Sequence, residues 1–275
     1  MIWNAEDVEI CKDMVSEWLS FEPVESNPNG LDKMWQNVSK HFADAGFELK
    51  IIENKEATYR PLLIASLENS KGNPWIGFFG HYDVEPADSD KWSTNPWELH
   101  EKQERWYGRG VADNLVPLAQ RIIMLNRFPT TVNIVYVLQG EEEIGSPFAL
   151  ENYPGLELPR VKLWIEETGY FYKDGRQRLM VLNRDSFLNS IINSLKSMAN
   201  HYNRSIVIRE RALNKAFGAE NCPCLKHLVK DTPYIAVGPN DDHSKVHGSD
   251  ESISLNHLEL IAKQYMKIAE VVSHG

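Results

Sequence analysis

A histidine and an aspartate stand two residues apart at the end of an apolar run. Residues 75–80 read WIGFFG, and His81-Tyr82-Asp83 follows at once. A histidine can bind a metal through one ring nitrogen while a carboxylate holds the other nitrogen and fixes the tautomer. A loop histidine with satisfied hydrogen bonds explains the same pattern, so this motif alone leaves both interpretations open.

Three consecutive glutamates, Glu141, Glu142 and Glu143, follow another apolar run at 131–138. Adjacent carboxylates repel one another unless cations or protons relieve them. A solvated acidic turn is one explanation. Metal-dependent hydrolysis is another, because it uses one carboxylate as a ligand and a neighbouring one to deprotonate water.

Three further segments carry possible ligands. Asp113 ends the run YGRGVAD ahead of an expected helix, where a simple N-cap is the alternative role. Glu166 and Glu167 follow a third apolar run, and His247 lies in the run HSKVHGSDE at 243–251. Each segment is a weak signal alone. Together they supply the imidazole nitrogens and carboxylate oxygens that suit zinc and other transition metals.

These segments need a framework that brings them together. Strands that alternate with helices predict an α/β sheet, and active sites of such sheets lie at the carboxyl ends of the strands. We therefore expect a single catalytic domain over residues 1–275, with a mostly parallel, twisted sheet and helices on both faces. The expected strands are 47–52, 61–67, 75–80, 131–138, 161–165, 205–209 and 233–237, and the expected helices are 5–20, 31–45, 114–127, 187–200, 223–230 and 254–272.

The composition limits the partners. The 275 residues include 29 basic and 39 acidic side chains, which give a net charge of −10. This charge argues against nucleic acid or an anionic membrane as a partner. The three cysteines give no disulfide framework. We find neither a signal peptide nor a membrane-spanning apolar run, and we expect a cytoplasmic protein.

The order and spacing of the motifs resemble those of the co-catalytic zinc peptidases and amidohydrolases. This family includes acetylornithine deacetylase, succinyl-diaminopimelate desuccinylase, aminoacylase and carnosinase. The resemblance covers nearly the whole chain. It rests on GHYD at 80–83, the loop from Trp92 to Glu98, YGRGVADN at 107–114, EEEIGS at 141–146, IEET at 165–168 and HGSDE at 247–251.

The resemblance implies two divalent metal ions, zinc in the first place with cobalt or manganese as alternatives. Asp113 would bridge the two ions, and the Asp113–Asn114 peptide bond would be cis. Asp83 would orient His81, and Glu142 would be the general base. The implied metal ligands are His81, Asp113, Glu143, Glu167 and His247.

The ligands would divide between the two metals. His81 and Glu167 would hold the first ion, and Glu143 and His247 would hold the second, with the bridging aspartate shared. Glu166 is the alternative to Glu167, although it stands one residue early for the I-x-E pattern.

Two segments depart from the family pattern. Relatives insert a lid domain, which also serves dimerisation, where this chain passes at 186–187 straight into an expected helix, so we expect no lid. The lid would supply a histidine for the oxyanion and groups that hold a substrate carboxylate, and we assign neither here. Residues 219–224 replace a glycine-rich substrate loop. We interpret Cys222 and Cys224 as reduced thiols, with metal binding or redox activity as the alternative.

The sequence therefore predicts a metal-dependent hydrolase that cleaves an amide bond of a small N-acyl amino acid or dipeptide through a metal-bridged water activated by Glu142. A catalytically silent metal-binding or partner-binding protein is one alternative. A hydrolase that needs a partner subunit or carrier protein to complete its site is another. Arg109 and Arg184 either anchor a substrate carboxylate or pair with loop acids. The histidines outside the motifs are interpreted as structural or exposed, and contact with substrate is an alternative role for His243.

Overall fold

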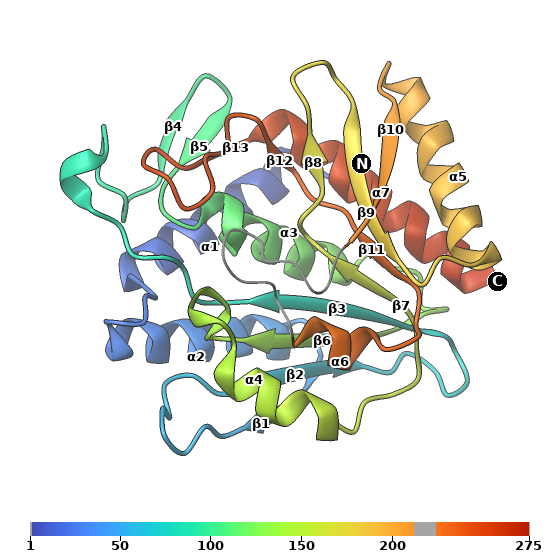
Figure 1. Ribbon diagram of the computed structural model, residues 1–275, viewed down its shortest axis with the longest axis horizontal. Helices are drawn as coiled ribbons and strands as arrows, with labels where there is room; N and C mark the ends of the chain where they lie inside the picture. Colours follow the sequence, from blue (N-terminus) through green and yellow to red (C-terminus); the bar gives the residue numbers. More distant parts are fainter. Residues whose placement is uncertain (1, 212–223, 275) are drawn as a thin grey trace.

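A long mixed sheet forms the centre of the computed structural model, which describes residues 2–211 and 224–274 (Figure 1). The strand order within the described residues is β1-β2-β6-β3-β7-β11-β9-β8-β12, and β10 pairs with β9. The strands are β1 (Glu48–Ile52), β2 (Leu62–Leu67), β3 (Trp75–His81), β6 (Asn133–Gln139), β7 (Val161–Glu166), β8 (Tyr170–Phe171), β9 (Gln177–Leu182), β10 (Ile206–Glu210), β11 (Tyr234–Ala236) and β12 (Asn240–Asp241).

The middle of this sheet is parallel, as the sequence predicts. β3 pairs in parallel with β6 and with β7, and β11 pairs in parallel with β7. Antiparallel pairings begin at β2 on one side and at β9 on the other. The four central strands therefore end at one edge of the sheet, the edge where ligands bind in open α/β folds.

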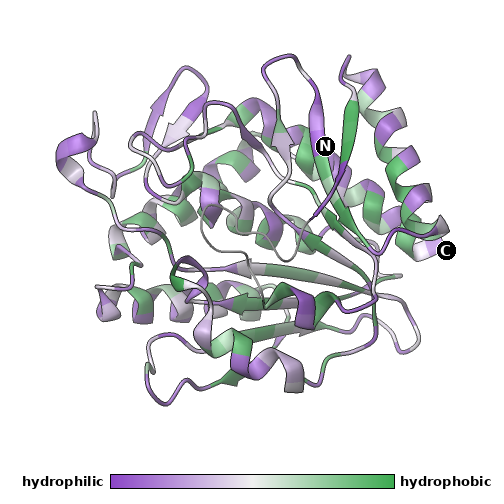
Figure 2. Cartoon of the chain, in the orientation of Figure 1, coloured by the Kyte–Doolittle hydropathy of each residue, from purple (hydrophilic) through white to green (hydrophobic). Residues whose placement is uncertain are grey.

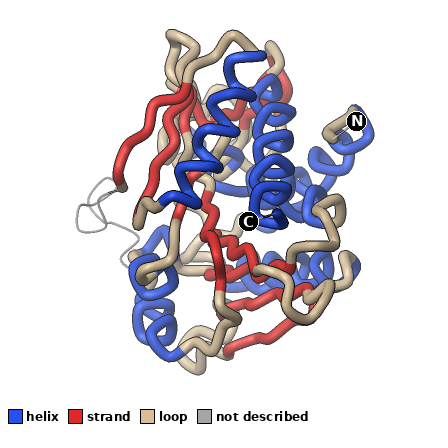
Figure 3. The backbone as a smooth tube through the Cα atoms, turned by 90° about the vertical axis from the view of Figure 1, so that its right-hand side faces the viewer, coloured by secondary structure: helices blue, strands red, loops and turns tan. Residues whose placement is uncertain are grey.

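Helices cover both faces of the sheet (Figure 3). Alternate side chains of β6 separate into two cores: Ile134 and Tyr136 pack in one cluster, and Val135 and Val137 in the other. Figure 2 shows the central strands as largely hydrophobic, whereas the helices present mixed faces. The first core includes residues of α1 (Ala5–Phe21), α2 (Pro28–Asp44), α3 (Val116–Leu125), α5 (Ser186–His201) and α7 (Leu255–His274), and the second includes residues of α4 (Pro147–Asn152) and α6 (Leu225–Val229).

Two helix starts differ from the prediction. The second helix begins at Pro28 rather than residue 31, because Asn27 caps it and proline is tolerated in the first turn. α3 begins at Val116 rather than residue 114. Asp113 and Asn114 have non-helical backbone angles, with φ values of −133° and −137°.

The prediction missed the six-residue strand β9 and several shorter strands. β4 (His100–Lys102), β5 (Arg105–Tyr107) and β13 (Ser252–Ser254) form a second, three-stranded sheet. Runs of three residues are too short to show a period of two. This small sheet joins the segment before Asp113 to the segment after His247, so it bears directly on the site.

Residues 183–185 alone join β9 to α5. Asp185 caps α5 by accepting a hydrogen bond from the backbone of Leu188, and β10 then returns to the sheet beside β9. The absence of a lid stays a prediction. Residues 219–223, with Cys222, lie outside the described residues, whereas Cys224 is buried. Across the described ranges, no helix combines the length and the apolar character needed to cross a membrane.

Candidate metal centre

Three neighbouring parallel strands deliver the first group of candidate ligands. β3 ends at His81, the glutamates 141–143 follow β6, and Glu167 follows β7. His81 lies opposite Gln139, the last residue of β6. The acidic turn after β6 therefore starts level with the histidine, and the strand register alone brings these side chains to one place.

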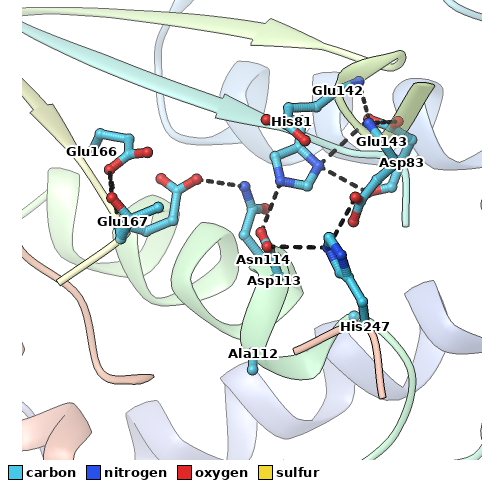
Figure 4. A network of polar contacts seen from close by, with 12 residues as sticks. His81, Asp83, Ala112, Asp113, Asn114, Glu142, Glu143, Glu166, Glu167 and His247 are labelled. Atoms are coloured by element: carbon cyan, nitrogen blue, oxygen red, sulfur yellow. Dashed lines mark hydrogen bonds and ion pairs between the residues drawn. The ribbon is translucent and has the colours of Figure 1, made fainter. Parts of the chain in front are cut away.

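Asp113 lies between two imidazoles (Figure 4). Its Oδ1 is 3.0 Å from His81 Nε2, and its Oδ2 is 3.5 Å from His247 Nε2. His247 Nε2 is also 3.0 Å from Glu143 Oε2. One ligand atom from each of His81, Asp113 and Glu143 lies within 4.8 Å of the others, and the same holds for Glu85, Glu143 and His247. The structure thus brings together four of the five predicted ligands.

The fifth predicted ligand, Glu167, lies to one side of this group. Its Oε1 accepts a hydrogen bond from Asn114 Nδ2 at 2.9 Å, and its Oε2 accepts one from Arg121 Nη1 at 2.7 Å. Asn114 directly follows Asp113, so Glu167 is linked to the centre through that neighbour (Figure 4).

Glu166, the alternative ligand, belongs to a different network. Arg211 Nη1 donates to its Oε1 at 3.0 Å, and the Tyr234 hydroxyl donates to its Oε2 at 3.0 Å. The two adjacent glutamates therefore point to different partners, and Glu167 is the one that faces the centre.

Asp83 fixes the end of β3. Its backbone oxygen lies 2.9 Å from His81 Nδ1, and its Oδ1 lies 3.4 Å from the same nitrogen. Because Nδ1 is held by Asp83, the other ring nitrogen, Nε2, is the one that faces Asp113. The Asp83 carboxylate also accepts the backbone N–H groups of Glu142 and Glu143 at 3.1 and 3.0 Å. One aspartate thus orients the histidine and positions the acidic turn.

Glu251 holds the backbone around Asp113. Its buried carboxylate pairs with Arg109 Nη1 at 2.7 Å. It also accepts hydrogen bonds at 2.9–3.1 Å from the backbone N–H groups of Gly110, Ala112 and Asp113. The Asp113–Asn114 peptide bond that follows is cis, as predicted.

Burial and crowding perturb the ionisation of the centre. Burial raises the pKa of Glu142 to about 7 and that of Glu143 to about 8, and the charge of Asp113 adds to both shifts. Hydrogen bonds to Asp113 and Glu143 raise the pKa of His247 to about 11. Burial opposes ionisation of Asp113, yet hydrogen bonds from His247 and His81 hold its pKa below the usual range. These shifts are those of an acidic cluster that positive charge stabilises.

The donor set fits a divalent cation. Imidazole nitrogens and carboxylate oxygens are common zinc ligands. The Glu143 side chain is 4% exposed, and its Oε1 is buried without a hydrogen-bond partner among the described residues. A buried carboxylate oxygen with no partner costs free energy, and a cation beside Glu143 would remove that cost.

Three residues near the centre carry roles that the sequence did not reveal. Arg121 binds Glu167, Glu85 lies beside Glu143, and Glu251 clamps the loop before α3. A charged residue on the apolar side of the expected helix 114–127 was a usable signal for Arg121. Glu251 stands four residues after His247, but spacing alone does not distinguish a clamp from a surface acid.

The two arginines singled out in the sequence have internal partners. Arg109 pairs with Glu251 and stacks on Trp92, with its guanidinium carbon 5.2 Å from the ring centroid. Arg184 donates to Asn189 in the first turn of α5. Of the two predicted roles for Arg109, pairing with a loop acid is the one that the structure shows.

Sequence comparison finds curated relatives that match part of this chain. Beta-Ala-His dipeptidase of Mus musculus is 40% identical over 97 residues, 33% of this chain and 20% of that protein. Acetylornithine deacetylase of Vibrio campbellii is 33% identical over 84 residues, 30% of this chain and 21% of that protein. The matches thus span about a fifth of these curated relatives.

Solved structures show the same fold. A di-peptidase of Saccharomyces cerevisiae superposes with a TM-score of 0.76 at 11% identity, covering 96% of this chain and 95% of that one. An M20 family metallo-carboxypeptidase of Sulfolobus solfataricus gives a TM-score of 0.74, also at 11% identity, covering 99% of this chain and 100% of that one. Residues 77–271 match the sequence pattern of peptidase family M20/M25/M40. Since this match spans most of the chain, the protein belongs to the peptidase family M20/M25/M40.

Proposed function

We propose that the protein is a metal-dependent hydrolase that cleaves an amide bond of a small N-acyl amino acid or a dipeptide. The observation that carries this proposal is the convergence of four ligand side chains from four separate segments, with His81, Glu143 and His247 grouped around Asp113. The names of the relatives support the choice of bond, because a dipeptidase and an N-deacetylase both hydrolyse amides.

Two divalent ions, zinc in the first place, would occupy the centre. When bound, such ions supply a water of lowered pKa and polarise the carbonyl to be attacked. Asp113 turns one oxygen toward each imidazole, which suits a ligand shared by both ions. The residues that would hold the ions are His81, Asp113, Glu143, Glu167 and His247.

Glu142 would move the proton. It starts the turn Glu142–Ile144 beside the ligand Glu143, and Asp83 fixes its backbone N–H. A carboxylate in this position can accept the proton of the attacking water and deliver it to the leaving amine. Asp83 acts on this step only through the residues that it positions.

Two buried arginines near the centre could be considered as partners of a substrate carboxylate. Arg109 is paired with Glu251, and Arg121 is paired with Glu167, so neither guanidinium is available to substrate. We infer that the chain has no lid domain after β9, where residues 183–185 alone lead into α5. A hydrolase that needs a partner subunit or a carrier protein to complete its site is the alternative to one that acts alone. Adding such a partner would then lower KM more than it raises kcat.

The test begins with metal-depleted protein and a panel of dipeptides and N-acyl amino acids, with Zn²⁺, Co²⁺ or Mn²⁺ added. Glu142→Gln should lose about 10²–10⁴-fold in turnover and keep its metal, as expected for a lost general base. Asp113→Asn should lose both metal and activity. Glu151→Gln, an exposed carboxylate on α4, is the matched control and should change neither.

One result would overturn the proposal, and a second would overturn only the assignment of the base. Metal uptake without turnover of any substrate in the panel would show that the protein binds metal but does not catalyse hydrolysis. Full activity in Glu142→Gln, alongside an inactive Asp113→Asn, would move the base to another residue.

A further inference from the structure

Arg121 places a guanidinium in the core behind the metal centre. The residue lies on α3 and is 1% exposed. Its Nη1 donates to Glu167 Oε2 at 2.7 Å. The remaining contacts, at 3.0–3.2 Å, are with the backbone oxygen of Phe79 and the hydroxyls of Tyr136 and Tyr265. The charge of this guanidinium is thus fixed in place, and Glu167 is the carboxylate that neutralises it.

Both oxygens of Glu167 are engaged by protein donors. Arg121 binds one oxygen and Asn114 binds the other. The Glu167 side chain is 4% exposed, so solvent screens its pairing with the guanidinium poorly. A cation bound to Glu167 would share that ligand with Arg121 and be repelled by it.

The other cation position has the opposite charge balance. Glu143 Oε1 is buried without a partner among the described residues. Glu85 places a carboxylate oxygen within 4.8 Å of the ligand atoms of Glu143 and His247. Two carboxylates therefore lie at this position, whereas at the position of Glu167 the negative charge is offset by the guanidinium of Arg121.

We propose that Arg121 makes the two cation positions unequal, so that the position at Glu143, His247 and Glu85 fills first and the position at Glu167 fills second and more weakly. This inference rests on the cation binding of the proposed function. Arg121 acts as a positioning residue: it holds Glu167 in place before the cation arrives and lowers the affinity of the position that Glu167 serves.

The experiment is a titration of metal-depleted protein with Co²⁺, followed by calorimetry and by the visible absorption of bound cobalt. The wild type should take up two equivalents, the second roughly 10–100-fold more weakly, the range found when groups behind a ligand are changed. Glu143→Gln should abolish the first step, and Glu167→Gln should leave it intact. This comparison needs no change at Arg121.

Substitution of the guanidinium then tests its role. Arg121→Met should tighten the second step by roughly 10–100-fold without moving the first, and Arg121→Lys should behave as the wild type. Co²⁺ should also raise the unfolding temperature of Arg121→Met more than that of the wild type, because the cation becomes the counter-charge of Glu167. Arg127→Met, at a residue that pairs with Asp7 instead, is the matched control.

The outcomes separate this inference from the proposed function. Two equal steps, a first step lost in Glu167→Gln, or a weaker second step in Arg121→Met would overturn the inference and leave the metal centre standing. No uptake of Co²⁺ by the wild type would overturn the proposed function as well.

Discussion

The inner and outer halves of the metal centre differ in how their polar groups are satisfied. The inner half comprises His81, Glu167 and Arg121, and the outer half comprises Glu85, Glu143 and His247. The side chain of His81 is 2% exposed, whereas that of His247 is 47% exposed. The inner carboxylate has a guanidinium and an amide as partners, while the outer half contains an oxygen with no partner among the described residues. Both oxygens of the inner carboxylate, Glu167, have protein partners without a cation, whereas one oxygen of the outer carboxylate, Glu143, has none among the described residues.

Exposure in the outer half does not mean that its backbone is free. Arg105 pairs with both oxygens of Asp241 at 2.7 and 3.0 Å and also donates to Ser252. These contacts fix both ends of the loop that carries His247. The comparison teaches that one candidate site can combine a histidine held by the core with a histidine presented to solvent on an anchored loop.

The largest expected effect comes from substituting Glu251. Its carboxylate links the backbone around Asp113 to the segment that follows His247. Glu251→Ala removes the acceptor for three backbone N–H groups and leaves Arg109 buried without its carboxylate. We expect a loss of roughly 3–5 kcal/mol in the free energy of unfolding, measured with urea. Glu270→Ala, at an exposed position on α7, should change it by less than about 0.5 kcal/mol. A similar small loss in Glu251→Ala would show that the halves hold together without this residue.

The second effect concerns the pH dependence of stability at a residue that packs beside the anchored loop, His257. His257 stacks on Phe171 and lies 3.0 Å from the backbone oxygen of Pro239, just before β12. Burial lowers the pKa of His257 to about 4. The unfolded chain therefore binds this proton more readily, so the stabilisation is complete above about pH 6.5 and is lost as the pH falls toward 4.

The shift corresponds to ~3 kcal/mol between these limits, at 1.36 kcal/mol per pKa unit. The measurement is the free energy of unfolding at pH 7 and pH 4.5, compared with that of His257→Gln, which should lose less on acidification. His274→Gln, at an exposed end of α7, serves as the control. An identical pH dependence in the wild type and His257→Gln would show that His257 does not help to anchor the loop that carries His247.

The third effect separates orientation from ligation in the inner half. Asp83→Ala leaves all five proposed ligands in place but frees His81 and the turn with Glu142 and Glu143. We expect a loss of roughly 10–100-fold in Co²⁺ affinity, as for other groups that orient ligands. Asp88→Ala, an exposed carboxylate in the next loop, should leave the affinity unchanged. Unchanged affinity in Asp83→Ala would mean that strand register alone orients His81.

Much of this arrangement could be predicted from the sequence. The apolar run before His81 and the run before Glu141 are neighbouring parallel strands, so their following residues had to meet at one edge. Periodicity also identified the long helices, because apolar faces of 16–20 residues leave a clear pattern. The family resemblance supplied the roles of residues that periodicity cannot assign.

The rest depended on contacts between distant residues. Arg121 and Glu167 are 46 positions apart, and their pairing follows from the packing of α3 against the sheet. The clamp by Glu251 requires β5 and β13 to pair, and strands of three residues carry no readable period. Local patterns therefore located the proposed ligands, while tertiary packing decided which of them received a counter-charge.

The smallest expected effect concerns the solvent-exposed edge of the outer half, beside His247. Val246 precedes His247 and is 37% exposed, so Val246→Ser should change the free energy of unfolding by less than about 0.5 kcal/mol. If substrates bind against this edge, KM for those with an apolar acyl group should rise about fourfold, the equivalent of one buried CH₂ group. KM for acetylated substrates should move less, and Ile51→Ser on β1, at a residue that is 43% exposed, should change neither KM. A uniform change across substrates would place the acyl group toward the inner half, where the side chains are already packed.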